Sequence, residues 1–123
     1  MPEFSFILLH VADPVASAAF YSTLLGIPIV EQAPTFAMLP MREGVMLGLW
    51  KRDGVEPKSM GAPGVSEVAF TVRDAAAVSA MHDAWKKKGL GILQKPTKMD
   101  FGTTFVAADP DGHWIRVFAP EGE

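Results

Sequence analysis

The order of strand and helix signals occurs twice along this chain. Val11-Ala12-Asp13 closes an apolar run and precedes a helical pattern, and Val72-Arg73-Asp74 does the same 61 residues later. Asp is a common residue at a helix N-cap, and in each half a series of short β-rich segments follows the helix. The repeat predicts an α+β fold of two tandem βαβββ modules. Two unrelated α+β modules are the alternative.

The elements of the first half follow from local signals. We expect a strand over residues 4–11, a helix over 15–25, and strands over 27–32, 36–39 and 45–51. Pro14 suits the first position of the helix and Gly26 its end, because Pro lacks the amide hydrogen and Gly tolerates a left-handed conformation. The helix carries apolar residues at helical spacing that we expect to face the core, namely Val15, Ala19, Phe20 and Leu24.

The second half begins after a linker. Residues 52–64 contain two Pro, three Gly and four charged residues without periodicity, which predicts an exposed connection. Asp74 is expected to cap a helix with an apolar stripe of Val78, Met81 and Trp85. Strands are expected over 65–72, 92–98, 103–108 and 113–118. We therefore expect a single domain over residues 1–123, with module one at 1–51, a linker at 52–64 and module two at 65–123.

A turn motif separates the last two strands. Asp109-Pro110-Asp111-Gly112-His113 combines a Pro that presets φ, a Gly that can take positive φ and Asp residues that hydrogen-bond nearby backbone. This turn, together with Phe20-Tyr21 and Leu25-Gly26, resembles the sequence motifs of one superfamily. It is the vicinal-oxygen-chelate superfamily, which includes glyoxalase I, extradiol dioxygenases and bleomycin resistance proteins. The resemblance implies curled mixed sheets that enclose a cleft. It also implies a homodimer.

Composition narrows the possible partners. The chain of 123 residues has no cysteine, which excludes disulfides and thiolate chemistry and fits the cytoplasm. Its formal net charge of −3 gives little attraction for nucleic acid, and it contains no run of about 18 apolar residues that would predict a membrane helix. We therefore expect a small-molecule partner, with no nucleic acid and no membrane.

Strand periodicity predicts which side chains face the cleft, because alternate residues point to opposite faces. Val68 and Phe70 suit the helix side, which leaves Glu67 on the cleft side, and the repeat makes Phe6 its counterpart. On the two closing strands the corresponding pair is Gly48 and Arg116. The resemblance implies that metal-dependent relatives carry His, Glu or Gln ligands at these four positions. Only Glu67 is such a donor, so we expect no metal and no other cofactor.

The expected ligand-binding residues are mostly aromatic. Trp50 is the expected stacking platform, with open space beside it at Gly48; its alternative role is to cap the sheet core. Phe101 is either a lid over the ligand or an exposed aromatic residue of a loop. His10 either contacts the ligand or is a structural residue whose hydrogen-bond partner lies within the protein. The full expected set is Phe6, His10, Phe36, Met38, Met46, Gly48, Trp50, Glu67, Phe101, Thr104, Trp114, Arg116 and Phe118.

Arg116 has two possible partners, because an arginine is rarely buried without one. It either pairs with Glu67 or receives an anionic group of the ligand. The resemblance places positions 67 and 116 around one centre, so we expect the two side chains to lie within reach of each other.

The sequence indicates binding rather than catalysis. It has no Gly-x-Ser-x-Gly motif, no cysteine and no phosphate-binding glycine loop, so we expect no catalytic residue. What remains is similar to the metal-free branch of the superfamily, the bleomycin, mitomycin and phenazine resistance proteins that hold a flat drug between aromatic side chains. We expect sequestration of a small planar aromatic compound. The alternative is a metal-free lyase or isomerase with Glu67 and His10 as its acid/base pair.

Overall fold

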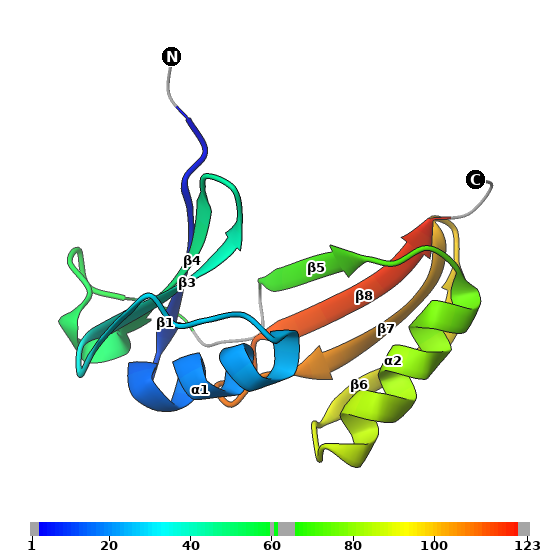
Figure 1. Cartoon of the computed structure of the whole chain (residues 1–123). Helices are drawn as coiled ribbons and strands as arrows, with labels where there is room; N and C mark the ends of the chain where they lie inside the picture. The colour runs from blue at the N-terminus through cyan, green and yellow to red at the C-terminus, as the bar shows by residue number, and fades with distance from the viewer. Residues whose placement is uncertain (1–2, 60, 62–65, 121–123) are drawn as a thin grey trace. The chain divides into compact units, whose positions relative to one another are not determined.

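The computed structural model describes residues 3–59, 61 and 66–120 of the chain. The chain divides into two compact units, Met1–Gly61 and Ala62–Glu123, which we call module one and module two. In the described residues each module contains one α-helix and one four-stranded mixed sheet, and most of these elements are labelled in Figure 1. The predicted tandem βαβββ fold is confirmed.

Module one begins with β1 (Phe6–Val11), α1 (Pro14–Leu25) and β2 (Glu31–Ala33). It continues with β3 (Phe36–Arg42), β4 (Val45–Lys51) and a short 3-10 helix, η1 (Arg52–Gly54). The strand order is β1-β4-β3-β2, with β1 parallel to β4 and the other neighbours antiparallel.

Module two repeats this plan. It contains β5 (Glu67–Thr71), α2 (Ala75–Lys87), β6 (Ile92–Met99), β7 (Gly102–Ala108) and β8 (Trp114–Pro120). The order β5-β8-β7-β6 is equivalent to that of module one, and β5 is parallel to β8. The expected strand over 65–72 is described from Glu67 to Thr71; Val65 lies outside the described residues.

Both helices begin as their sequences predict. The Asp13 carboxylate accepts hydrogen bonds from the amides of Val15 and Ala16, and Asp74 caps α2 through the amide of Ala77. Gly26 ends α1 with φ of 70°, a left-handed conformation that favours glycine. No helix in the described part of the chain combines the length and hydropathy needed to cross a membrane.

One face of each sheet packs against the helix of its own module. In module one Val11, Leu39, Leu47 and Leu49 are fully buried on this face, and α1 contacts β2, β3 and β4. In module two α2 packs on β6, β7 and β8, and Trp85 contacts Phe105 edge to face at 5.4 Å between ring centroids. We call the opposite face of each sheet, which its own helix does not cover, the open face.

Prolines explain two strand boundaries that differ from expectation; β1 also differs, since it begins at Phe6 rather than at residue 4. Residues 27–30 were expected in a strand, but β2 begins at Glu31, after Pro28, a residue without an amide hydrogen for a ladder. β3 extends to Arg42 rather than stopping at Leu39, because Pro40 and Arg42 still pair with β4. On its other side β3 pairs with β2 no further than Met38. The missing amide of Pro40 therefore leaves no ladder bond unmade.

The segment predicted as an exposed linker is exposed at most of its described positions, but it contains η1, and Val55 within it is buried. The predicted inner face of α1 was wrong: the structure buries Pro14, Ser17, Ala18 and Tyr21, while Val15 is 40% exposed.

Candidate functional site

Strand pairing sets three side-by-side rows on the open face of module one. His10, Trp50 and Phe36 form the first row, because His10 pairs with Trp50 and Trp50 with Phe36. The second row runs from Leu8 through Gly48 and Met38 to Glu31. The third contains Phe6, Met46 and Pro40. The strand alternation predicted for β1 and β4 is the observed one.

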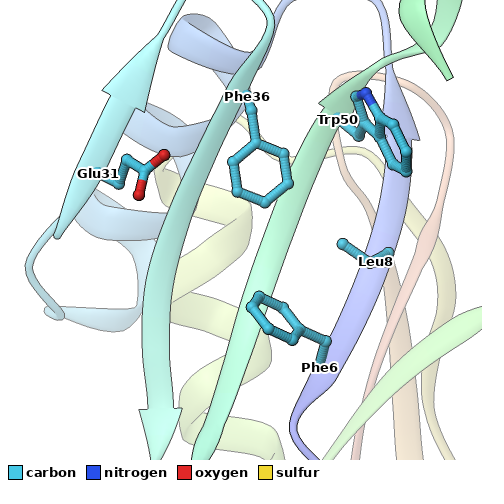
Figure 2. Close-up of a pocket in the computed structure, with 5 residues that line it drawn as sticks. All are labelled: Phe6, Leu8, Glu31, Phe36 and Trp50. Atoms are coloured by element: carbon cyan, nitrogen blue, oxygen red, sulfur yellow. The ribbon is translucent and has the colours of Figure 1, made fainter.

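A pocket of about 460 Å³ lies on this open face. Its lining residues are Phe6, Leu8, Glu31, Phe36 and Trp50, shown in Figure 2. The first two come from β1, and Glu31, Phe36 and Trp50 come from β2, β3 and β4. Four of the five side chains are apolar, and Phe6 and Leu8 are 43% and 45% exposed. Such a surface offers flat, apolar contact to a small molecule.

Gly48 allows the pocket residues to lie close to the sheet. A Cβ at this position would lie 2.5 Å from Leu8 Cδ2 and 3.0 Å from Phe36 Cζ. The expectation of open space at Gly48 was therefore wrong: Leu8 and Phe36 fill the space that a side chain would occupy. Glycine here brings two lining side chains over the backbone of β4, and the free volume lies above them.

Trp50 is held at the edge of the pocket by His10. The two rings meet edge to face, with centroids 6.3 Å apart and an interplanar angle of 87°. The Nδ1 atom of His10 lies 2.7 Å from the Ser59 hydroxyl oxygen, so the imidazole itself is anchored by the segment that follows η1. His10 thus supports the indole and is not itself a lining residue.

The structure brings together only part of the expected set in this pocket. Met38 and Met46 lie on the same face, as their pairing shows, but they are not among its lining residues. Glu31 lines the pocket and was not expected. Its position follows from the hairpin in which Ala33 pairs with Phe36 across Pro34 and Thr35. Treating Pro34-Thr35 as a two-residue turn would have placed Glu31 opposite Met38.

The open face of module two carries a polar network around Arg116. Its Nε donates to Glu67 Oε1 at 2.8 Å, so the predicted proximity of these residues is confirmed. Its Nη1 donates to the Thr104 hydroxyl at 3.2 Å and lies 3.5 Å from Gln94 Oε1. Gln94 was not expected at this site. The pairing register of β6 shifts between Gln94 and Thr97, where Pro96 lies, so simple alternation along β6 does not predict which face Gln94 is on.

Aromatic side chains border this network. The Arg116 guanidinium lies 5.9 Å from the Phe101 ring centroid, and Phe101 meets Phe118 edge to face at 5.8 Å. Phe101 is 44% exposed, and it lies in the turn between β6 and β7. Trp114 pairs with Glu67 and is 37% exposed. Within module two, Phe101 therefore covers the arginine rather than projecting freely.

The Asp109 carboxylate stabilises the turn from Asp109 to His113 by accepting hydrogen bonds. Asp109 Oδ1 accepts hydrogen bonds from the amides of Asp111 and His113 at 2.9 and 2.8 Å, and Oδ2 lies 3.0 Å from His113 Nδ1. Among the described residues, Asp109, Asp111 and His113 also form a group of potential metal ligands with donor atoms within 4.8 Å of one another. The hydrogen bonds that Asp109 accepts hold these three residues together in the tight turn predicted from the sequence, and they account for the closeness of the donor atoms.

The two residues of the acid/base alternative belong to different modules. His10 is hydrogen-bonded to Ser59 in module one, and Glu67 forms an ion pair with Arg116 in module two. Each has a structural partner within its own module, and neither lines the pocket.

Comparison with known proteins agrees with this architecture. Over 113 residues the chain is 27% identical to the phenazine antibiotic resistance protein EhpR of Enterobacter agglomerans, covering 89% of this chain and 86% of that protein. The solution NMR structure of protein ATC0852 from Agrobacterium tumefaciens is 46% identical, with a TM-score of 0.89 over 99% of this chain and 100% of that chain.

A third similarity concerns the fold alone. The crystal structure of a glyoxalase/bleomycin resistance protein/dioxygenase from Nocardioides is 24% identical, with a TM-score of 0.84 over 100% of this chain and 87% of that chain. The family model of the Glyoxalase/Bleomycin resistance protein/Dioxygenase superfamily matches residues 4–117, nearly the whole chain. Because this model matches nearly the whole chain and the chain has the two βαβββ modules, the chain belongs to the Glyoxalase/Bleomycin resistance protein/Dioxygenase superfamily.

Proposed function

We propose that this protein binds and sequesters a small planar aromatic compound in the pocket of module one, as a resistance-type binding protein. The observation that carries the proposal is the pocket itself: four apolar side chains, two of them phenylalanines and one a tryptophan, around about 460 Å³. Aromatic faces bind flat rings by stacking and by burial of apolar area. The similarity to a phenazine antibiotic resistance protein supports the same class of ligand.

We propose further that binding does not require a metal. The superfamily resemblance places metal ligands at positions 6, 48, 67 and 116. Here Phe6 and Gly48 offer no donor atom, and the Glu67 carboxylate is already bonded to the Arg116 guanidinium at 2.8 Å. A cation next to the single carboxylate opposes binding of a divalent ion, so these residues do not fit a metal centre. The homodimer that the resemblance implies stays a prediction, which sedimentation of the pure protein would test.

Titration calorimetry with acridine, a neutral three-ring compound, tests the proposal. Acridine should bind the wild type, and Trp50→Ala should weaken binding by about 5- to 150-fold, the range for loss of a central aromatic contact of about 1 to 3 kcal/mol. Trp50→Phe keeps a flat ring and should lie between the two. Leu93→Ala is the matched control, because Leu93 is an exposed apolar residue of β6 outside the pocket.

Melting temperatures of the four proteins separate a binding defect from misfolding. Equal acridine affinity in wild type and Trp50→Ala, with both folded, would show that this pocket is not the binding site. Failure of the wild type to bind any planar three-ring compound, whether neutral or charged, would contradict the proposed ligand class.

A further inference from the structure

The pocket of module one contains one charged group. Glu31 is the lining residue of β2, and the other four lining side chains carry no charge. Within the described part of the chain, its carboxylate has no hydrogen bond or ion pair. Figure 2 shows this carboxylate on the opposite side of Phe36 from Trp50. The pocket therefore presents an aromatic surface with a negative charge at one end.

The cations of module one are placed elsewhere. None of them lines the pocket. Lys51 follows Trp50 on β4, so strand alternation directs it to the opposite face. The Arg52 guanidinium donates to the carbonyl oxygen of Gly61. Among the described residues that line this pocket, Glu31 is therefore the only charged one.

We propose that the pocket selects planar aromatic compounds that carry a positively charged nitrogen, bound by the Glu31 carboxylate and by the faces of the surrounding aromatic rings. This inference rests on the proposed function and defines its ligand class. A cation near an aromatic face gains attraction from the ring quadrupole, and a carboxylate nearby adds a charge-assisted hydrogen bond. An anionic ring would instead meet an unpaired carboxylate.

The spacing of the strands suits a ligand of this kind. Leu8, Gly48, Met38 and Glu31 lie in one row on four neighbouring strands. Three strand spacings separate its ends by about 14 Å between Cα atoms. A two- or three-ring compound spans much of that row once the side chains at both ends are included, and a charged nitrogen on the edge of its ring system then lies next to Glu31.

The alternative of an anionic ligand has weaker support. It rested on Arg116, and the structure shows that Nε and Nη1 of this residue already donate to Glu67 and Thr104. An incoming carboxylate would have to compete with an existing ion pair. Glu31, by contrast, has no such partner to displace among the described residues.

The test compares three acridines of similar shape by titration calorimetry at pH 7 and low salt. The probes are acridine, which is neutral, 9-aminoacridine, which is cationic, and acridine-9-carboxylate, which is anionic. Wild type should bind the cation about 5- to 30-fold more tightly than acridine, a range that combines an exposed cation–π contact with a partly exposed ion pair. Added salt should reduce this preference.

Variants assign the preference to one carboxylate. Glu31→Gln should bring the cation and acridine to within about 3-fold of each other while leaving acridine affinity nearly unchanged, since only the charge is lost. Glu31→Lys should reverse the order and favour the carboxylate probe. The matched control is Glu43→Gln, which removes the same charge from the exposed turn between β3 and β4 and should keep the wild-type preference.

The outcomes separate this inference from the function on which it rests. Trp50-dependent binding of acridine without a cation preference overturns the inference and leaves the proposed function standing. A cation preference that is as large in Glu31→Gln as in the wild type, or tightest binding of acridine-9-carboxylate by wild type, also overturns it. Failure of the wild type to bind any of the three probes overturns both.

Discussion

Replacing Gly48 by alanine tests how closely the floor of the pocket is packed. The new methyl carbon would lie 2.5 Å from Leu8 Cδ2, and 3.0 and 3.3 Å from two carbons of the Phe36 ring. The first separation forces a movement, and both affected side chains line the pocket. The change therefore acts on the shape of the binding surface from beneath it.

Two opposing terms set the effect on stability. Overpacking costs about 1 to 3 kcal/mol, and the lower end applies because Leu8 is 45% exposed and its terminal methyl groups can rotate toward solvent. Replacing glycine also restricts the unfolded chain, which contributes about 0.5 to 1 kcal/mol in the other direction. We expect a net destabilisation of about 0 to 2 kcal/mol, measured by urea denaturation.

Gly48→Ala should also weaken the binding of acridine. The displaced Leu8 methyl and the tilted Phe36 ring would occupy space now open to the ligand, and acridine affinity should fall about 5- to 30-fold, or about 1 to 2 kcal/mol. Gly54→Ala is the matched control: a Cβ there meets nothing within 4 Å and Gly54 has no positive φ. We expect no change in binding for that variant.

Either of two results would refute this reasoning. Unchanged acridine affinity in a folded Gly48→Ala protein would show that Leu8 and Phe36 do not shape the ligand site. A loss of more than about 4 kcal/mol would show that these side chains cannot move, contrary to the exposure of Leu8.

Two further predictions concern module two and metal independence. Arg116→Met should destabilise by about 1 to 2 kcal/mol, since the Glu67 side chain is 39% exposed and solvent screens the orphaned charge. Adding Glu67→Gln should recover part of this loss in a double-mutant cycle followed by urea denaturation, and strictly additive effects would contradict the pairing. A chelator should leave the melting temperature unchanged, because Phe6 and Gly48 offer no ligand atoms; stoichiometric metal lost together with stability would contradict this.

Much of the fold was predictable because it depends on local signals. Asp13 and Asp74 cap helices in both halves, and the 61-residue repeat places equivalent strands in equivalent register. Phe6 pairs with Met46 where Glu67 pairs with Trp114, as the repeat requires. Alternation placed Arg116 and Glu67 on one face, and the superfamily resemblance implied that they lie close together; the structure shows them on neighbouring parallel strands.

Helix α1 shows where local pattern was insufficient. Apolar residues occur nearly all around it, so several faces had comparable hydrophobicity, and the predicted face was wrong. The structure buries Tyr21 completely and leaves Val15 on the outside. Packing against the sheet of module one selected the face, and that choice depends on side-chain volumes that a helical period does not contain.

The sequence by itself determined the repeated strand and helix order, the helix caps, the final turn and the alternation that sorts Trp50 and Arg116 to the open faces. These depend on backbone preferences and on side-chain periods of two or 3.6 residues. Only the tertiary structure decided that Leu8 and Phe36 cover Gly48 and that Glu31 joins the pocket. The physical reason is that such contacts depend on side-chain rotamers and on packing across several strands, which local sequence does not specify.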